Sequence, residues 1–558
     1  MKIKETIPDI NPSVFLEDYC KAHNIEDIDS FMSPSILNVE PISNYDNMQE
    51  GCELILKNIN NNICILVDTD ADGYTSASII YNYIKDINID AKISFVIHEN
   101  KEHGLDDEVA LNKILELNPN LLICPDSASG DYEQHKRLKK LNIDTLCLDH
   151  HPVDKYSEYA VVINNQLSKS VSNKDFCGAG VVYKFVKYCD SKFNTNHADK
   201  YIDLVALGNI ADIMDTRQIE TRYYIMEGLK NISNKFFLDM VKTYCKKTEN
   251  ITMTDISFMI SNRINAIIRS GTYEDKIHLF YAFIEPDKKV LWQKGVRSKE
   301  QEYTMSEKCV LLSEKLKKQQ ADEVNEILSS GSELTNELPF TMIKTFEKSN
   351  YNGLIAMRTC SDTKKPTLVG NNGSGSYRAL SSHDNMKELL LTYPNMEYVE
   401  GHNYAGGYKV KDGYWDNFIE WIKTHSVDYA EYVVKSYKYD EIPDSLFQDC
   451  YQNQHLWGAG IKSPLFHIKP FQLNSSQIMM MGNNTTLKIP LGNLSAIKFF
   501  CSKKIREDFY VGEYTDIEVE LIVELSVNYW GDGKYNQFLI KDYSVKKTAP
   551  KIKWDDLI

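Results

Sequence analysis

The chain has 558 residues, of which 42% are hydrophobic and 25% are charged, and its net charge at pH 7 is −16. One hydrophobic core rarely grows beyond roughly 250 residues, so this length predicts several domains. The composition excludes fibrous and disordered chains. The acidic charge excludes a uniformly basic surface, although it still permits one basic groove.

Cysteine usage and the N-terminal segment favour a cytoplasmic protein. The twelve cysteines include no C-x-x-C pair, which argues against a zinc ribbon and against a disulfide framework. The opening "MKIKETIPDINPSVF" lacks the apolar core of a signal peptide, and no segment approaches the roughly 18 apolar residues of a membrane span. We therefore expect neither export nor a membrane partner.

The first third of the chain alternates strand-like and helix-like segments. The apolar runs lie at 63–67, 93–97, 121–124, 144–148 and 160–163, and helical patterns lie near 74–87, 107–117, 131–141 and 178–190. Single helices between such strands indicate βαβ units and a mostly parallel sheet. We predict an α/β domain over residues 1–230.

Three further regions follow in the chain. Residues 231–335 are predicted to form a helical connector, with a long amphipathic helix over 300–330 that contains no proline. A smaller α/β domain is predicted over 336–437, where "GNNGSGSYRAL" and "GHNYAGGYKV" are rich in glycine. Short alternating strands over 438–558 are typical of a β-barrel or sandwich.

Acidic and histidine side chains follow three of the predicted strands of the first domain. The carboxyl ends of neighbouring parallel strands lie along one edge of a sheet, where ligands bind. We therefore expect these side chains to converge. They are Asp68, Asp70 and Asp72 in "DTDADG", Asp126 in "PDSASGD", and Asp149, His150 and His151 in "LDHHPVD".

A fourth segment, "YIDLVALGNIADIMD", is helix-like and reaches Asp212. Aspartates with one or two imidazoles form a site of hard oxygen and nitrogen ligands, which suits Mn²⁺ or Mg²⁺ better than a structural zinc. Two such ions would neutralise the carboxylates and activate a water for in-line attack on phosphorus. Phosphodiester hydrolysis is the chemistry that this set favours.

Each motif alone has an ordinary structural explanation. Aspartate-rich turns after strands are usually solvated loops or helix caps, and adjacent histidines are commonly surface residues. An EF-hand is excluded because no glutamate occupies the twelfth position of a loop that begins at Asp68. The four motifs together, in this order, favour one shared site.

The same four motifs resemble those of the DHH phosphoesterases. Beyond them, "FCGAGVVYKF" and "NRINAIIRSG" resemble segments of RecJ-type exonucleases, and "GSGSYR" and "GHNYAGGYKV" resemble motifs of the DHH-associated domain. "WGAGIKSPLF" and "SVNYWGDGKYNQFLIKDY" resemble the oligonucleotide-binding (OB) barrel of that family. The resemblance implies a parallel-sheet DHH catalytic domain, a helical connector, a DHH-associated substrate-binding domain and an OB-like nucleic-acid-binding domain.

Site residues follow from this resemblance. It implies two Mn²⁺ or Mg²⁺ ions, with His151 contacting the scissile phosphate or assisting the leaving oxygen. Asp72 would orient the metal ligands without binding the metal itself, or it would cap a helix. No histidine shortly precedes the first aspartate, although some DHH enzymes have one there. The implied metal ligands are Asp68, Asp70, Asp126, His150 and Asp212. The implied substrate-binding residues are Arg263, Asn265, Arg269, Gly373, Ser374, Gly375, Arg378, His402 and Gly406, and helix packing or capping remains open for Arg263, Asn265, Arg269 and His402.

The resemblance implies a hydrolase, a RecJ-like single-stranded-DNA exonuclease that works from 5′ to 3′ if it follows the family. It implies roles in DNA repair and recombination in a bacterial cell or a phage-infected bacterium. We expect a monomer and leave a single-stranded-DNA-binding protein or a helicase open as partners. Two alternatives remain open: a phosphodiesterase of oligoribonucleotides or cyclic dinucleotides, and a non-catalytic DNA-binding replisome protein with a degenerate DHH site.

Overall fold

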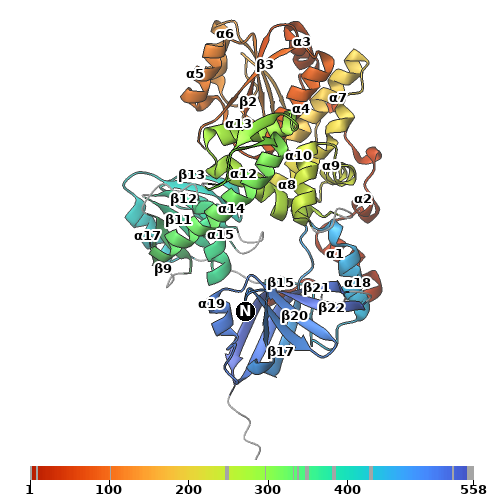
Figure 1. Ribbon diagram of the computed structural model, residues 1–558, viewed down its shortest axis with the longest axis vertical. Coiled ribbons are helices and arrows are strands. Elements are labelled where there is room, and N and C mark those ends of the chain that lie inside the picture. Colours follow the sequence, from red (N-terminus) through yellow and green to blue (C-terminus); the bar gives the residue numbers. More distant parts are fainter. Residues whose placement is uncertain are drawn as a thin grey trace, which may run out of the picture. The chain divides into compact units, whose positions relative to one another are not determined.

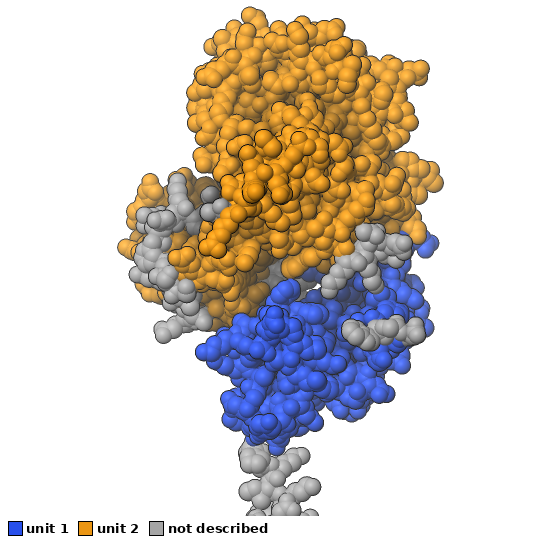
Figure 2. Space-filling view, viewed as in Figure 1, with its two compact units in different colours: residues 1–32, 428–457, 461–558 blue, residues 33–427, 458–460 orange. Residues whose placement is uncertain are grey.

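A computed structural model of the chain shows two compact units (Figures 1 and 2). One contains residues 33–427 and 458–460, and the other contains residues 1–32, 428–457 and 461–558. The structure describes residues 3–7, 10–100, 102–245, 251–295, 297–330, 332–335, 339–345, 351–371, 373–379, 385–425, 431–530 and 533–548.

A five-stranded parallel sheet forms the N-terminal part of the larger unit, in the order β3-β2-β4-β5-β6. This confirms the predicted α/β fold. The strands are β2 (Asn62–Val67), β3 (Lys92–Ile97), β4 (Leu121–Pro125), β5 (Asp144–Asp149) and β6 (Val161–Asn164).

Helices cover both faces of this sheet, which explains why its strands are continuous apolar runs rather than alternating ones. Ile63, Ile65 and Val67 of β2 pack in one core with α3 (Met48–Asn58), α4 (Ala71–Ile87) and α7 (Gly178–Phe193). Cys64 and Leu66 point to a second core with α5 (Glu108–Leu117) and α6 (Tyr132–Lys140).

The strand order reverses direction at β2. From β2 the chain crosses to β3 on one side, and it then returns to β4 on the other side of β2. Ligands bind at such a switch point, outside the carboxyl ends of the strands. The topology therefore places the turns after β2 and β4 beside a natural binding site.

A group of helices follows the sheet. The long helix predicted over 300–330 begins at Met305, because Gln301–Thr304 (β8) pairs with β7 (Lys289–Trp292). Thr304 and Glu307 then exchange hydrogen bonds in the pattern of a capping box. The helices are α8 (Ile202–Ala211), α9 (Ile219–Lys230), α10 (Lys235–Tyr244), α11 (Met253–Asp255), α12 (Asn262–Ser270), α13 (Tyr273–Ile284) and α14 (Met305–Ser330).

The rest of the larger unit is a second α/β region with a mixed six-stranded sheet in the order β13-β14-β12-β11-β10-β9. Its elements are β9 (Ser332–Thr335), β10 (Thr341–Thr345), α15 (Asn352–Thr363), β11 (Thr367–Asn371), β12 (Ser374–Arg378), α16 (Met386–Leu391), β13 (Met396–His402), β14 (Ala405–Val410) and α17 (Trp415–Lys423).

The other unit contains a mixed seven-stranded sheet, in the order β16-β17-β21-β22-β20-β19-β18. This is the all-β region predicted near the C-terminus. At the start of the chain, β1 (Ile3–Glu5) pairs in parallel with β15 (Glu431–Val433). The other α-helices and strands are α1 (Phe15–Ala22), α2 (Ile28–Met32), β16 (Ser436–Tyr437), α18 (Asp444–Gln452), β17 (Phe466–Asn474), β18 (Met479–Met481), β19 (Thr486–Leu491), β20 (Leu494–Phe499), α19 (Lys503–Asp508), β21 (Asp516–Trp530) and β22 (Gly533–Lys547).

No described helix combines the length and the apolar character needed to cross a bilayer. The four domain boundaries predicted from the sequence divide the chain more finely than the two compact units, and they stay a prediction.

A buried ion pair joins two helices of the larger unit. Lys184 on α7 is fully buried and pairs with Glu220 on α9. Removing one partner of a buried pair leaves an uncompensated charge. We expect Glu220→Gln to lower the free energy of unfolding by about 3–5 kcal/mol in urea denaturation. The exposed pair of Glu227 and Lys230 on α9 gives the control, because Glu227→Gln should shift stability by less than about 0.5 kcal/mol. Equal effects of the two substitutions would contradict this account.

Candidate metal centre

Three strand ends and one helix end bring acidic and histidine side chains together. Asp68 follows β2, Asp126 follows β4, and His150 follows β5. Asp212 is the residue directly after α8. Because β2 and β4 flank the switch point of the sheet, these side chains lie where an open parallel sheet binds ligands.

The His150 imidazole lies at the centre of this cluster. Its Nε2 is 3.2 Å from Asp126 Oδ1, 3.4 Å from Asp212 Oδ2 and 4.0 Å from Asp72 Oδ2. The set Asp72, His150 and Asp212, and the set Asp126, His150 and His151, are each compact enough to hold one metal ion. Three carboxylates and an imidazole therefore surround one point.

Burial makes this arrangement costly without a cation. Desolvation and the charges of neighbouring aspartates raise the pKa of Asp126 and of Asp212 well above the usual range. Burial and the charge of Asp70 raise the pKa of Asp72 to about 6. Burial lowers the pKa of His150 to about 4, so that at neutral pH its ring is uncharged and has a lone pair for a metal.

The donor set fits a hard divalent ion. Asp126 Oδ1 is buried and has no hydrogen-bond partner among the described residues, although it faces His150. Carboxylate oxygens with a single imidazole nitrogen are ligands that suit Mn²⁺ and Mg²⁺. A bound cation would satisfy this orphaned oxygen and offset the repulsion among the aspartates.

Two glycines create the space for these carboxylates. A Cβ at Gly178 would lie 2.3 Å from Asp126 Oδ1, and a Cβ at Gly208 would lie 2.3 Å from Asp72 Oδ1. The backbone N–H groups of Gly178 and Ala179, at the start of α7, donate to Asp72. Asp72 therefore anchors a helix N-terminus while one of its oxygens lies 4.0 Å from His150.

The neighbouring His151 is held as a charged group. Its Nδ1 donates to Asp149 Oδ1 over 2.8 Å, and the backbone N–H groups of Ser129, His150 and His151 also donate to Asp149. Partial desolvation by the surrounding protein works against the charge of His151, but this partnership with Asp149 raises its pKa to about 10. The side chain is 55% exposed, so a protonated imidazole at the edge of the site is accessible to solvent.

Two histidines that sequence reasoning missed flank Asp68. His103 Nδ1 lies 2.7 Å from Asp68 Oδ2, and His98 Nε2 lies 3.8 Å from Asp68 Oδ1. His98 directly follows β3, the partner of β2 at the edge of the sheet. His98 carries the same signal as the other three strand ends, because in "FVIHEN" it is the polar residue directly after a parallel strand.

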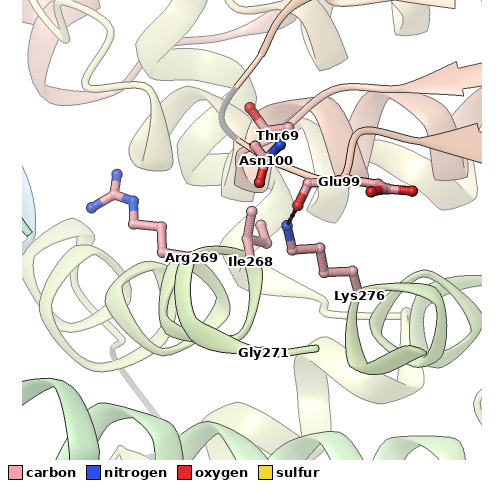
Figure 3. A pocket seen from close by; sticks show the side chains of 7 residues that line it. All are labelled: Thr69, Glu99, Asn100, Ile268, Arg269, Gly271 and Lys276. Atoms are coloured by element: carbon pink, nitrogen blue, oxygen red, sulfur yellow. Dashed lines mark hydrogen bonds between the residues drawn. The ribbon is translucent and has the colours of Figure 1, made fainter. Parts of the chain in front are cut away.

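Asp70 and Arg269 lie within electrostatic reach of each other. Asp70 caps α4 by accepting the Gly73 N–H, and its charge contributes to the raised pKa values of the other aspartates. Surrounding protein lowers the pKa of Arg269, and the Asp70 carboxylate opposes that effect. Arg269 also lines a cavity of about 190 Å³ beside the site (Figure 3). The other lining residues are Thr69, Glu99, Asn100, Ile268, Gly271 and Lys276.

Among the substrate-binding candidates, Arg378 on β12 lies near Arg269, whose charge adds to burial in lowering the pKa of Arg378. Arg263 is instead buried, pairs with Glu314 and lies over the ring of Tyr244. Asn265 lies on the same helix and is half-buried.

The glycine-rich candidates lie within the second sheet. Gly375 on β12 and Gly406 on β14 allow close approach of the backbone, because a Cβ on either would lie about 2 Å from a carbonyl oxygen. Ser374 begins β12, and Gly373 precedes it with a φ of +88°. His402 ends β13, and its side chain lies outside the described residues. Substrate binding by these residues stays a prediction.

The chain resembles known proteins over nearly its whole length. Residues 62–209 match the model of the DHH family, N-terminal domain. A protein of Bacillus subtilis strain 168, named "Putative SPbeta prophage-derived single-strand DNA-specific exonuclease YorK", is 31% identical over 95% of this chain and 96% of its own. The chain belongs to the DHH family. This confirms the DHH membership predicted from the motifs.

More distant relatives agree in sequence and in fold. The single-stranded-DNA-specific exonuclease RecJ of Bacillus subtilis strain 168 is 21% identical over 92% of this chain and 66% of its own length. A crystal structure of RecJ from Thermus thermophilus in complex with Mn²⁺ superposes with a TM-score of 0.71, at 17% identity, over 98% of this chain and 80% of that one. The RecJ-like fold therefore extends across both units.

The buried aspartates generate a prediction about stability and pH. The pKa of Asp126 is higher in the folded state than the roughly 3.9 of an unfolded aspartate, so its ionisation destabilises the metal-free fold as pH rises from about 4. We expect metal-free Asp126→Asn to melt at a higher temperature than the parent protein at pH 7, with a difference that shrinks towards pH 4. Differential scanning fluorimetry in the presence of a chelator measures the difference in melting temperature at pH 7 and its change towards pH 4. A variant less stable than the parent at pH 7 would contradict the proposed repulsion.

Proposed function

We propose that this protein is a metal-dependent exonuclease that hydrolyses phosphodiester bonds of single-stranded DNA. The observation that carries the proposal is the partly buried cluster in which His150 Nε2 lies within 3.4 Å of both Asp126 and Asp212, at the switch point of a parallel sheet. Its DHH family membership and the names of its relatives, YorK and RecJ, point to the same reaction.

Two Mn²⁺ or Mg²⁺ ions would be held by Asp68, Asp70, Asp126, His150 and Asp212. The geometry adds Asp72 as a further candidate, since its Oδ2 lies 4.0 Å from His150 Nε2. When bound, such ions would activate a water for in-line attack and neutralise the phosphodiester. The protein fixes the carboxylates in place beforehand, which avoids a reorganisation cost during the reaction.

His151 is suited to assist the leaving oxygen. Asp149 accepts the Nδ1 proton and keeps the ring charged, so the Nε2–H remains available as a hydrogen-bond or proton donor. The ring is exposed, unlike that of His150, and can meet a phosphate entering from solvent. Adjacent histidines thus take different roles because their surroundings shift their pKa values in opposite directions.

Two arginines would bind the substrate phosphate. Arg269 and Arg378 repel each other, and an anion between them would relieve that repulsion. The neighbouring cavity of about 190 Å³ is smaller than the roughly 300 Å³ of common small-molecule sites. It would therefore admit a phosphate or part of a nucleotide, while most of the strand stays outside.

The smaller unit has features suited to a longer single strand. Exposed aromatic rings include Phe499, Phe500, Tyr514, Tyr529 and Tyr535, and bases stack on such rings without sequence preference. Lys541 pairs with Glu524, so its charge is less available to a DNA phosphate. A dinucleotide would not need these rings, so they favour a long strand over a dinucleotide as substrate.

Several finer points belong to the same proposal. Digestion would run from 5′ to 3′, by a two-metal mechanism, in a cytoplasmic monomer. A single-stranded-DNA-binding protein or a helicase would supply the strand. Four domains, at 1–230, 231–335, 336–437 and 438–558, would divide catalysis, connection, substrate binding and strand binding.

Digestion of single-stranded and duplex DNA labelled at either end tests the proposal. With Mn²⁺ we expect single strands to be degraded from the 5′ end, duplex to be spared, and Asp126→Asn to lower the rate by at least about 10³-fold, since a metal ligand would be lost. Asp154→Asn changes an exposed aspartate after β5 and should leave the rate unchanged. Full activity of Asp126→Asn would refute the site, and preference for a labelled dinucleotide would refute the substrate.

A further inference from the structure

His98 lies outside the four DHH motifs but directly beside the first aspartate. In the parallel pairing of β2 with β3, Val67 lies opposite Ile97, so the next residues, Asp68 and His98, leave the sheet side by side. Both side chains are buried, with 1% and 0% of their surface exposed. Their nearest polar atoms, Asp68 Oδ1 and His98 Nε2, are 3.8 Å apart.

Asp107 determines which nitrogen of His98 carries the proton. The carboxylate of Asp107 lies 2.8 Å from His98 Nδ1 and also accepts the backbone N–H of Val109 at the start of α5. A carboxylate oxygen at this distance from Nδ1 accepts a hydrogen bond from the N–H there, and the lone pair of Nε2 then points towards Asp68. Carboxylates orient metal-binding imidazoles in this way.

Two buried acceptors therefore face each other without a donor. Among the described residues, neither Asp68 Oδ1 nor His98 Nε2 has a hydrogen-bond partner. Such groups cost free energy when they are left unsatisfied. Their separation is too long for a hydrogen bond, yet it allows one ion to touch both atoms, because bonds from Mg²⁺ to its ligands are about 2.0–2.1 Å long.

We propose that Asp68 Oδ1 and His98 Nε2 hold one divalent cation of this site, next to the cation held by His150, Asp126 and Asp212. The inference rests on the proposed function, and it adds a ligand from β3 to that site. His98 would be a direct ligand, and Asp107 would be the residue that positions it.

His103 provides a matched control. It also contacts Asp68, but through the other oxygen, Oδ2, and its side chain is 53% exposed. Its removal leaves the pair of Asp68 Oδ1 and His98 Nε2 in place. Substitution by leucine removes the ligand atoms of either histidine and introduces no new oxygen or nitrogen.

Isothermal titration calorimetry of the full chain with Mn²⁺ gives the stoichiometry. We expect two ions in the parent protein, two in His103→Leu, and one in His98→Leu with circular dichroism unchanged. Two ions in His98→Leu would overturn the inference and leave His98 as a structural partner of Asp68. Loss of an ion in His103→Leu alone would overturn it by identifying the exposed imidazole as the ligand.

Electron spin-echo envelope modulation distinguishes direct ligation from positioning. In the His150→Leu background, the Mn²⁺ remaining at Asp68 should show ¹⁴N coupling, and His98→Leu in that background should abolish it. Absence of ¹⁴N coupling in His150→Leu would overturn the inference. If the parent protein binds Mn²⁺ and degrades DNA, but no ¹⁴N coupling from His98 is detected, only this inference is refuted. A parent protein that neither binds Mn²⁺ nor degrades DNA would refute the proposed function as well.

Discussion

Mutual repulsion of buried carboxylates is the constraint around which this protein is organised. Asp72, Asp126 and Asp212 crowd around one imidazole, and their pKa values rise because burial and like charge oppose ionisation. A bound divalent cation would offset this cost and convert it into binding free energy. The fold would thereby give up stability in its metal-free state for a site that is already shaped for an ion.

The architecture converges on that point. The parallel sheet places three strand ends together, beside the point where its strand order switches direction at β2. Gly178 and Gly208 leave room for the carboxylate oxygens, and the first N–H groups of α7 hold Asp72. The Asp149 carboxylate keeps the His151 imidazole protonated, while burial keeps the His150 imidazole neutral. Position, space and protonation state are thus all determined by neighbouring backbone and side chains.

The sequence predicted most of this arrangement, because parallel strands make the site a property of strand ends. Apolar runs located β2 to β6, and the polar residues after them located Asp68, Asp126 and His150. What the pattern could not supply were contacts that depend on tertiary packing. For Arg263 the motif left substrate binding and helix packing open, and only the folded chain shows that this side chain is buried and paired with Glu314. His98 was passed over because it stands alone after its strand. A single polar residue at a strand end becomes informative only when the neighbouring strand is known.

The central claim is that a divalent cation binds among Asp72, Asp126, His150 and Asp212. Crystals grown without metal and then soaked in Mn²⁺ test it directly, through anomalous difference density measured near the manganese absorption edge. The account predicts a strong peak within bonding distance of His150 Nε2 and Asp126 Oδ1. Absence of a peak among these side chains, in crystals that bind Mn²⁺ elsewhere, would contradict it.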